Sequence, residues 1–228
     1  MALSQEGYHI LVASRSLEEL QKLQKELPST SLCLPLDLSN PAQITEFVGR
    51  IHQTPIASEG LGALINNAGI ISRQSFDGMP QETWTSEMQT NLLGPVQLTR
   101  ELKPLLLRSQ NASVINISST LGLRPIEQTS SYSASKAAIN SWTQSLALEW
   151  SPEIRVNAIC PGLVDTPIHG FHSEKANSQI KMQMHQMLPM KRMGVPQDIA
   201  EVTKFLVSEN ASWITGALWT VDGGISLR

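Results

Sequence analysis

The chain has 228 residues, of which 41% are hydrophobic and 16% are charged, and its formal net charge is −3. The charged share is too low for a disordered tail or a charge-rich coiled coil, and the lack of a basic excess argues against nucleic acid as a main partner. No apolar run approaches the length of a membrane span, and the N-terminus lacks the basic and apolar regions of a signal peptide. We therefore expect a single cytoplasmic domain over residues 1–228, with no nucleic-acid or membrane partner.

Short apolar runs alternate with helical segments along the whole chain. We predict strands at 8–13, 31–36, 61–65, 112–117, 154–159 and 217–221, and helices at 16–27, 40–52, 81–107, 130–150 and 196–208. Ser16 and Asn40 stand where N-caps are expected, and Pro41 suits a first helical position. This alternation, with nearly continuous apolar strands, indicates an α/β fold in which helices cover both faces of a parallel sheet.

The cysteines point to no special chemistry. Cys33 and Cys160 lie far apart in apolar segments, so we expect two buried free thiols rather than a disulfide. No group of cysteines and histidines has the spacing of a zinc site, although His169 and His172 share a loop. We therefore expect no bound metal.

Small and polar residues follow the predicted strands, at the edge where an open parallel sheet binds its ligands. They occupy positions 13–16, 37–39, 66–69, 118–119 and 160–162. Their small size would let a flat ligand lie close to the backbone at this edge.

Tyr132 and Lys136 lie four residues apart in the helix predicted at 130–150, so the phenol and the ammonium share one helix face. A neighbouring positive charge favours phenolate, and we expect Lys136 to lower the pKa of Tyr132 from its usual value of about 10. A tyrosine tuned in this way acts as a general acid or base. The spacing alone is a weak signal, because a surface helix with an exposed lysine shows the same pattern.

Further motifs stand around this pair in a fixed order. They are Asp37-Leu38 after a strand, Asn66-Asn67-Ala68-Gly69, Asn91 in the long helix, Ser119 thirteen residues before Tyr132, Pro161-Gly162 with Thr166, and Asp222-Gly223-Gly224. The arrangement resembles the short-chain dehydrogenase/reductase family, in the branch of the beta-ketoacyl-carrier-protein reductases and the small alcohol and sugar dehydrogenases. The resemblance covers Gly7 to Arg228 and implies a Rossmann-type, doubly wound parallel sheet.

The resemblance implies an oxidoreductase that transfers hydride between NAD(P) and a small-molecule carbonyl or secondary alcohol. Tyr132 would exchange a proton with the substrate oxygen, and Ser119 would hydrogen-bond that oxygen and stabilise its developing charge. Lys136 would lower the pKa of the tyrosine and bind the nicotinamide ribose. Asn91 would anchor a water that relays protons to Lys136.

One feature of the sequence supports the role of Asn91. Pro95, four residues later, has no N–H to offer the Asn91 carbonyl, which predicts a helix kink and a carbonyl available to water. The alternative is that Gly94 and Pro95 merely break the helix.

Cofactor preference is read after the first predicted strand, where folds that prefer NAD usually carry an acidic residue. This chain has Ser14 and Arg15 there, and a guanidinium can pair with a 2′-phosphate. We favour NADP and keep NAD open, since an exposed arginine without a ligand is the other interpretation. The resemblance places the remaining cofactor contacts on Asp37, Leu38, Asn67, Ala68, Gly69, Tyr132, Lys136, Pro161, Gly162, Val164 and Thr166.

The sequence departs from the family at its start, where the glycine-rich turn T-G-x-x-x-G-x-G is missing. Residues 1–6 resemble the end of the helix after that turn, so roughly 20 residues of the family pattern are absent. Because the missing strand is central in the family's sheet, two strand edges would stay unpaired. We expect that the natural chain begins upstream; alternatively, another segment fills the gap or dinucleotide binds poorly. The same departure motivates a second functional hypothesis, a non-catalytic nucleotide sensor or scaffold.

Residues 165–193 take the place of the family's substrate lid and hold five of the eight methionines. Flexible methionines suit a lid over a partly apolar substrate, although a helix packed on its own domain or on a partner subunit explains them equally well. Leu121, Leu123 and Ile126 would add an apolar wall, and Arg73 would meet an anionic substrate or carrier. A ketoacyl thioester, a small ketone, a sugar and a steroid-like alcohol all remain open as substrates.

The C-terminal region 214–228 is apolar and contains glycines. In the family this region packs subunits together, so the resemblance implies a homo-oligomer, either a dimer or a homotetramer. An ordinary core strand explains the same residues.

Overall fold

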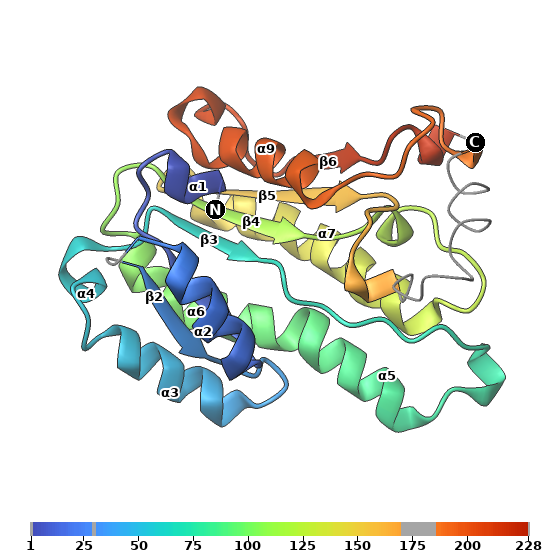
Figure 1. Cartoon of the computed structure of the whole chain (residues 1–228), viewed down its shortest axis with the longest axis horizontal. Coiled ribbons are helices and arrows are strands. Elements are labelled where there is room, and N and C mark those ends of the chain that lie inside the picture. Colours follow the sequence, from blue (N-terminus) through green and yellow to red (C-terminus); the bar gives the residue numbers. More distant parts are fainter. Residues whose placement is uncertain (1, 29–30, 170–185, 228) are drawn as a thin grey trace.

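Parallel strands form two sheets in the computed structural model, which describes residues 2–28, 31–169 and 186–227 (Figure 1). The smaller sheet pairs β1 (Leu11–Ser14) with β2 (Leu32–Pro35). The larger sheet has the order β3-β4-β5-β6, with β3 (Ala63–Asn66), β4 (Ala112–Ile117), β5 (Ile154–Pro161) and β6 (Leu218–Val221). Neighbouring strands are parallel throughout, which confirms the predicted sheet type.

Helices alternate with these strands. They are α1 (Ala2–Gln5), α2 (Leu17–Glu26), α3 (Pro41–Ile51), α4 (Ile56–Glu59), α5 (Gln81–Met88), α6 (Gly94–Leu106), α7 (Ser130–Trp150) and α9 (Pro196–Val207). Both predicted N-caps are confirmed, because Ser16 Oγ accepts a hydrogen bond from Glu19 N at 3.2 Å and Asn40 Oδ1 accepts one from Ala42 N at 3.1 Å. The short α4 was not predicted.

The larger sheet is buried on both faces. Val114 of β4 packs in one hydrophobic cluster with Trp150 of α7, while the next residue, Ile115, packs in another cluster with Leu206 of α9. Consecutive strand residues point to opposite faces, so α7 covers one face and α9 covers the other (Figure 1). This arrangement confirms the doubly wound α/β fold.

The two sheets are not hydrogen-bonded to each other. Among the described residues, β1 pairs only with β2, and β3 pairs only with β4, so the outer edge of β3 has no partner strand. These are the two strand edges expected from the missing central strand. A hydrophobic cluster spans the split, because Leu11 of β1 and Leu64 of β3 both pack against residues of α3 and α6.

The long helical stretch predicted at 81–107 is confirmed, and the structure divides it into three consecutive helical parts. α5 ends at Met88, a π-helical segment η2 covers Gln89–Leu93, and α6 begins at Gly94. The amide of Gly94 donates to the carbonyl of Gln89, five residues earlier. Since Pro95 cannot donate to Asn91, the hydrogen-bond pattern shifts by one residue, and the expected kink takes the form of a π-bulge.

Cys160 is buried and Cys33 is only half-buried, and both are free thiols. In the described part of the chain, no helix has the length and apolar character needed to cross a bilayer. The subunit contact expected at 214–228 stays a prediction; Trp213, next to it, is 97% exposed.

Gly94 lies where α6 approaches the loop after β2 most closely, and this contact is testable. A Cβ at Gly94 would lie 2.9 Å from the Cβ of Leu38 and 3.0 Å from its carbonyl carbon. We predict that Gly94→Ala lowers the free energy of unfolding by about 1–3 kcal/mol, because the new methyl group meets backbone atoms of the loop.

The control for this prediction is Gly49→Ala in α3. Nothing lies within 4 Å of a Cβ at Gly49, and Ala gains about 0.5–1 kcal/mol over Gly inside a helix. Urea unfolding of both variants measures the difference, and a Gly94 variant as stable as the Gly49 variant would contradict the predicted clash.

Candidate active site

The N-terminal half of α7 presents different side chains to different surroundings, because residues four apart share a helix face. Tyr132 and Lys136 face the carboxyl end of β4, where Lys136 Nζ donates to the carbonyl of Ile117. Ser131 and Ser135 face α5 and η2. A third face lines a pocket. The predicted catalytic pair is therefore brought to the predicted sheet edge.

Lys136 is tightly held. Its side chain is 3% exposed, its ammonium donates to Ile117 O at 2.8 Å, and Nζ lies 5.7 Å from the ring centroid of Tyr132. Burial lowers the pKa of Lys136 to about 8, while the neighbouring Cys160 acts in the opposite direction. The ammonium and the phenol are thus adjacent in a largely dry environment.

Tyr132 is 8% exposed, and burial raises the pKa of its phenol above the usual value. Hydrogen bonding with Ser119 lowers this pKa, the charge of Glu87 raises it, and the charge of Arg73 lowers it, each by less than burial does. The net direction is opposite to the lowering that we expected from Lys136, because desolvation of the phenolate outweighs its favourable contacts. Tyr132 therefore carries its proton at neutral pH.

The two serines after β4 have different tasks. Ser119 begins the short helical turn η3 (Thr120–Gly122), accepts a hydrogen bond on Oγ from Leu121 N at 3.1 Å, and contacts Tyr132. Ser118 instead donates from Oγ to the carbonyl of Lys136 at 3.1 Å. Ser119 therefore reaches the phenol, in agreement with its spacing in the sequence, while Ser118 fixes α7 against β4.

Asn91 is 1% exposed and binds two parts of the chain together. Its Oδ1 accepts from Ile70 N at 2.8 Å, and its Nδ2 donates to Ile70 O at 2.9 Å and to Ser135 Oγ at 3.1 Å. A Cβ on Gly69 would lie 3.4 Å from both Asn91 Oδ1 and Lys136 Nζ. The side chain positions the loop after β3 beside the lysine, so the predicted water contact would fall to the main-chain carbonyl of Asn91.

Sequence patterns do not single out Glu87, which the structure places in the site. Its carboxylate is fully buried, accepts from Ser131 Oγ at 2.6 Å and accepts from the amide of Ser72. The one signal in the sequence is its position four residues before Asn91, on the same helix face.

The expected adenosine end of the cofactor site lies on the smaller sheet. Ser14 ends β1, and the exposed Arg15 follows it. At the end of β2, Asp37 Oδ1 accepts from the amide and the hydroxyl of Ser39 at 2.9 and 2.7 Å. Burial raises the pKa of Asp37, but these bonds and the charge of Arg15 bring it below its usual value. Leu38 packs into the core, so only its backbone can meet a ligand.

The expected nicotinamide end lies after β5. A Cβ on Gly162 would lie 2.6 Å from the Cβ of Asp222, so the loop passes the end of β6 only with glycine there. Pro161 ends β5, Val164 is buried, and Thr166 Oγ1 donates to Val164 O at 3.4 Å. The remaining predicted contacts, Asn67 and Ala68, are exposed after β3.

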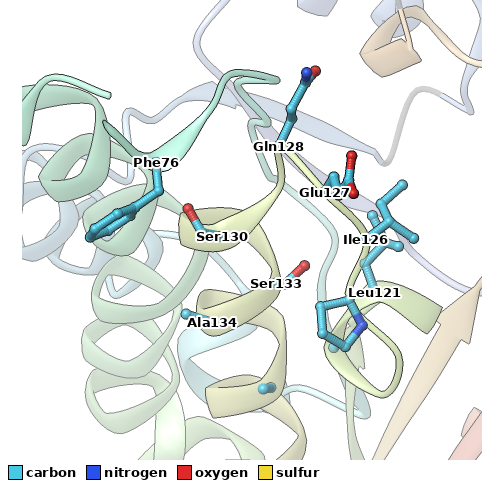
Figure 2. A pocket seen from close by; sticks show the side chains of 11 residues that line it. Phe76, Leu121, Ile126, Glu127, Gln128, Ser130, Ser133 and Ala134 are labelled. Carbon is cyan, nitrogen blue, oxygen red and sulfur yellow. The ribbon is translucent and has the colours of Figure 1, made fainter. Parts of the chain in front are cut away.

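Two of the three residues expected to form an apolar wall, Leu121 and Ile126, line a pocket. This pocket of about 480 Å³ opens between α7, Phe76 and the loop after η3 (Figure 2), and Tyr132 is not among its lining residues. The third residue, Leu123, is 43% exposed. The loop after η3 runs along this face of α7, and the role of its apolar side chains as a wall for the substrate stays a prediction.

Only the ends of the predicted lid at 165–193 belong to the described residues. Met182, Met184 and His172 lie outside them. Met193 is 5% exposed and packs inward, whereas Met187 and Met190 are 60% and 64% exposed. The lid stays a prediction.

Comparison with known sequences agrees with this geometry. The sequence model of the family described as Enoyl-(Acyl carrier protein) reductase matches residues 1–226. A 3-oxoacyl-[acyl-carrier-protein] reductase of Thermotoga maritima is 31% identical over 229 residues, which cover 99% of this chain and 90% of that protein. Granaticin polyketide synthase putative ketoacyl reductase 2 of Streptomyces violaceoruber is 34% identical, with 99% and 89% of the two chains covered.

Solved structures show the same likeness. The aldohexose dehydrogenase of Thermoplasma acidophilum is 29% identical and has a TM-score of 0.88, covering 100% of this chain and 89% of the other. A glucose/ribitol dehydrogenase-type structure from Brucella melitensis is 26% identical and has a TM-score of 0.89, with 98% and 88% covered. These comparisons show that the chain is an oxidoreductase of the short-chain dehydrogenase/reductase family.

Proposed function

We propose that the chain uses NAD(P) to interconvert a small carbonyl compound and a secondary alcohol, with Tyr132 exchanging a proton with the substrate oxygen. The observation that carries the proposal is the meeting of Tyr132, Lys136 and Ser119 at the carboxyl end of β4. The carbonyl of Ile117 takes one of the three donors of the Lys136 ammonium. The two remaining N–H donors of Lys136 can bind a hydroxyl group of the ligand. Ser119 would stabilise negative charge on the substrate oxygen.

The residues present fit both ends of a nicotinamide dinucleotide. Arg15 and Asp37 lie just after the neighbouring strands β1 and β2, where a cation suits a 2′-phosphate and a fixed carboxylate suits the adenosine. At the other end, Gly69 leaves the approach to Lys136 Nζ uncovered by a side chain. The bound cofactor would supply or accept the hydride. We favour NADP, because the position after β1 holds Arg15 rather than an acidic residue.

The state of Tyr132 favours the direction of carbonyl reduction. Burial raises the pKa of the phenol, so Tyr132 holds a proton that it can donate to a carbonyl oxygen as that oxygen gains charge. Alcohol oxidation needs the phenolate, which this environment disfavours.

The substrate is proposed from the rim of the site. Arg73 is exposed on the loop after β3, and its charge is near enough to lower the pKa of Tyr132. We propose that Arg73 meets an anionic group on the substrate or its carrier. The similar proteins are a reductase of carrier-bound oxoacyl groups and a dehydrogenase of aldohexoses, and the former class carries such charge. We also propose a homo-oligomer, with the exposed Trp213 next to the contact.

Tyr132→Phe tests the acid role directly. We predict that carbonyl reduction falls by about 10²–10⁴-fold, because the variant lacks the proton donor while the ring still packs in place. The matched control is Tyr8→Phe, which removes the chain's other phenol outside the site. Turnover is followed by consumption of NADPH, and circular dichroism reports the fold. Near-parental turnover by Tyr132→Phe would refute the mechanism, and no turnover by the folded parent would favour a non-catalytic sensor or scaffold.

Arg15→Gln tests the cofactor preference. We predict that NADPH binds about 10-fold more weakly or worse while NADH binding changes little, since a charge-assisted pair with the 2′-phosphate contributes about 1.5–3 kcal/mol. Fluorescence titrations of both cofactors give the dissociation constants. Arg100→Gln, at an exposed position of α6, is the control for loss of a positive charge. An equal loss of affinity for both cofactors would argue against recognition of the 2′-phosphate.

A further inference from the structure

Glu87 is a buried carboxylate that the mechanism above does not use. It is fully inaccessible, and among the described residues no basic side chain forms an ion pair with it. Both of its oxygens accept hydrogen bonds, one from the hydroxyl of Ser131 and one from the amide of Ser72. Each oxygen of the carboxyl group therefore has a hydrogen-bond partner. A buried charge without a basic partner costs stability, so its place beside the site needs a reason.

Glu87 forms one of two parallel links between α5–η2 and α7. Glu87 accepts from Ser131, and Asn91, four residues later, donates to Ser135, also four residues later. Each link also binds the loop after β3, Glu87 through Ser72 and Asn91 through Ile70. The two serines directly precede Tyr132 and Lys136. The two links therefore set the rotation of the helix that presents the catalytic pair.

The charge of Glu87 also acts on Tyr132. Four titratable groups lie near this phenol or its lysine neighbour on separate elements: Glu87 of α5, Arg73 of the loop after β3, Lys136 of α7, and Cys160 of β5, a thiol whose pKa burial raises to about 11. Glu87 opposes formation of the phenolate, and Arg73 favours it. The two act with opposite signs on the same oxygen.

We propose that Glu87 is a positioning residue for the catalytic tyrosine, whose buried carboxylate anchors the first turn of α7 and keeps Tyr132 protonated for carbonyl reduction. The part of this proposal that concerns carbonyl reduction rests on the proposed function. The effect of Glu87 on the ionisation of Tyr132 does not depend on any substrate. Glu87 is thus an additional residue beside the predicted catalytic residues Asn91, Ser119, Tyr132 and Lys136.

Ionisation of the tyrosine can be measured without activity, because the chain has only two tyrosines. In a Tyr8→Phe background, Tyr132 is the only phenol, and its phenolate is followed by ultraviolet difference absorbance as pH is raised. We expect Glu87→Gln to move the midpoint down by about one pH unit, since a neighbouring negative charge has been removed. Gln keeps the shape and can still bond both Ser72 and Ser131.

Matched variants separate charge from packing. Arg73→Gln removes a charge of the opposite sign and is expected to move the midpoint upward. Glu82→Gln removes an exposed carboxylate from the first turn of the same helix and is expected to leave it unchanged. Glu87→Asp keeps the charge and is expected to keep the midpoint near the parent. Because Glu87→Gln removes an unpaired buried charge, it should unfold at the parental temperature or above.

The pH dependence of the reduction rate should shift in the same direction as the midpoint of Tyr132 ionisation. Reduction needs the protonated phenol, so its rate falls at alkaline pH, and Glu87→Gln should move that alkaline limb to lower pH in kcat more than in KM. Circular dichroism over the same pH range shows up to which pH the chain stays folded. If the chain unfolds before Tyr132 ionises, the alkaline limb of kcat replaces the absorbance midpoint as the test. An unmoved midpoint and limb in Glu87→Gln would overturn the proposal. A shifted midpoint in a folded chain that reduces no carbonyl compound would instead uphold the tuning of Tyr132 and reject the proposed function.

Discussion

Burying an ammonium group costs free energy unless a fixed acceptor meets it, and Lys136 meets the carbonyl of Ile117 at 2.8 Å. Two further contacts hold the lysine backbone. Ser118 donates to its carbonyl, and a Cβ on Gly122 would lie 2.7 Å from its carbonyl carbon, so η3 packs directly on the main chain of α7. The helix cannot slide along β4 without breaking all three contacts. Tyr132, one turn earlier on the same face, takes its position from this anchor, and its dry surroundings follow from the same close packing.

Amide side chains tie together the elements beneath the site. Asn66 of β3 donates to Thr99 of α6 at 3.0 Å and to Asn116 of β4 at 2.8 Å, and Asn116 donates to Thr143 of α7 at 2.9 Å. These bonds are buried, where a satisfied polar network strengthens and fixes one arrangement. Asn66 belongs to a motif that resembles a cofactor contact, yet its side chain serves the framework, while the exposed Asn67 next to it stays available to a ligand. Two neighbouring residues of one motif thus have different roles: Asn66 stabilises the framework, and Asn67 is available to a ligand.

The sequence was most informative where structure depends on local patterns. β4 and α7 begin and end as predicted, because an apolar run and a long helical pattern are decided within their own residues. The same local reasoning predicted a kink at Asn91 from Pro95, but not its π-helical form. It also failed for the burial of Glu87 and for the direction of the pKa of Tyr132. Each of these depends on which distant elements surround a side chain, and a buried glutamate looks like a solvated one when only its own helix is read.

The proposed cofactor site draws on both sheets, and this makes its geometry depend on the packing between them. Arg15 and Asp37 lie just after the strands of the smaller sheet, whereas Lys136 and Gly162 lie at the edge of the larger one. Since no strand pairing joins β1 to β3 among the described residues, the relative placement of the two ends rests on side chains of α3 and α6 in the cluster that spans the split, and on the contact of Gly94 with Leu38. The catalytic group, in contrast, is fixed within the larger sheet. A change in that cluster therefore acts first on cofactor affinity and only afterwards on proton transfer, which separates loss of binding from loss of chemistry in this chain.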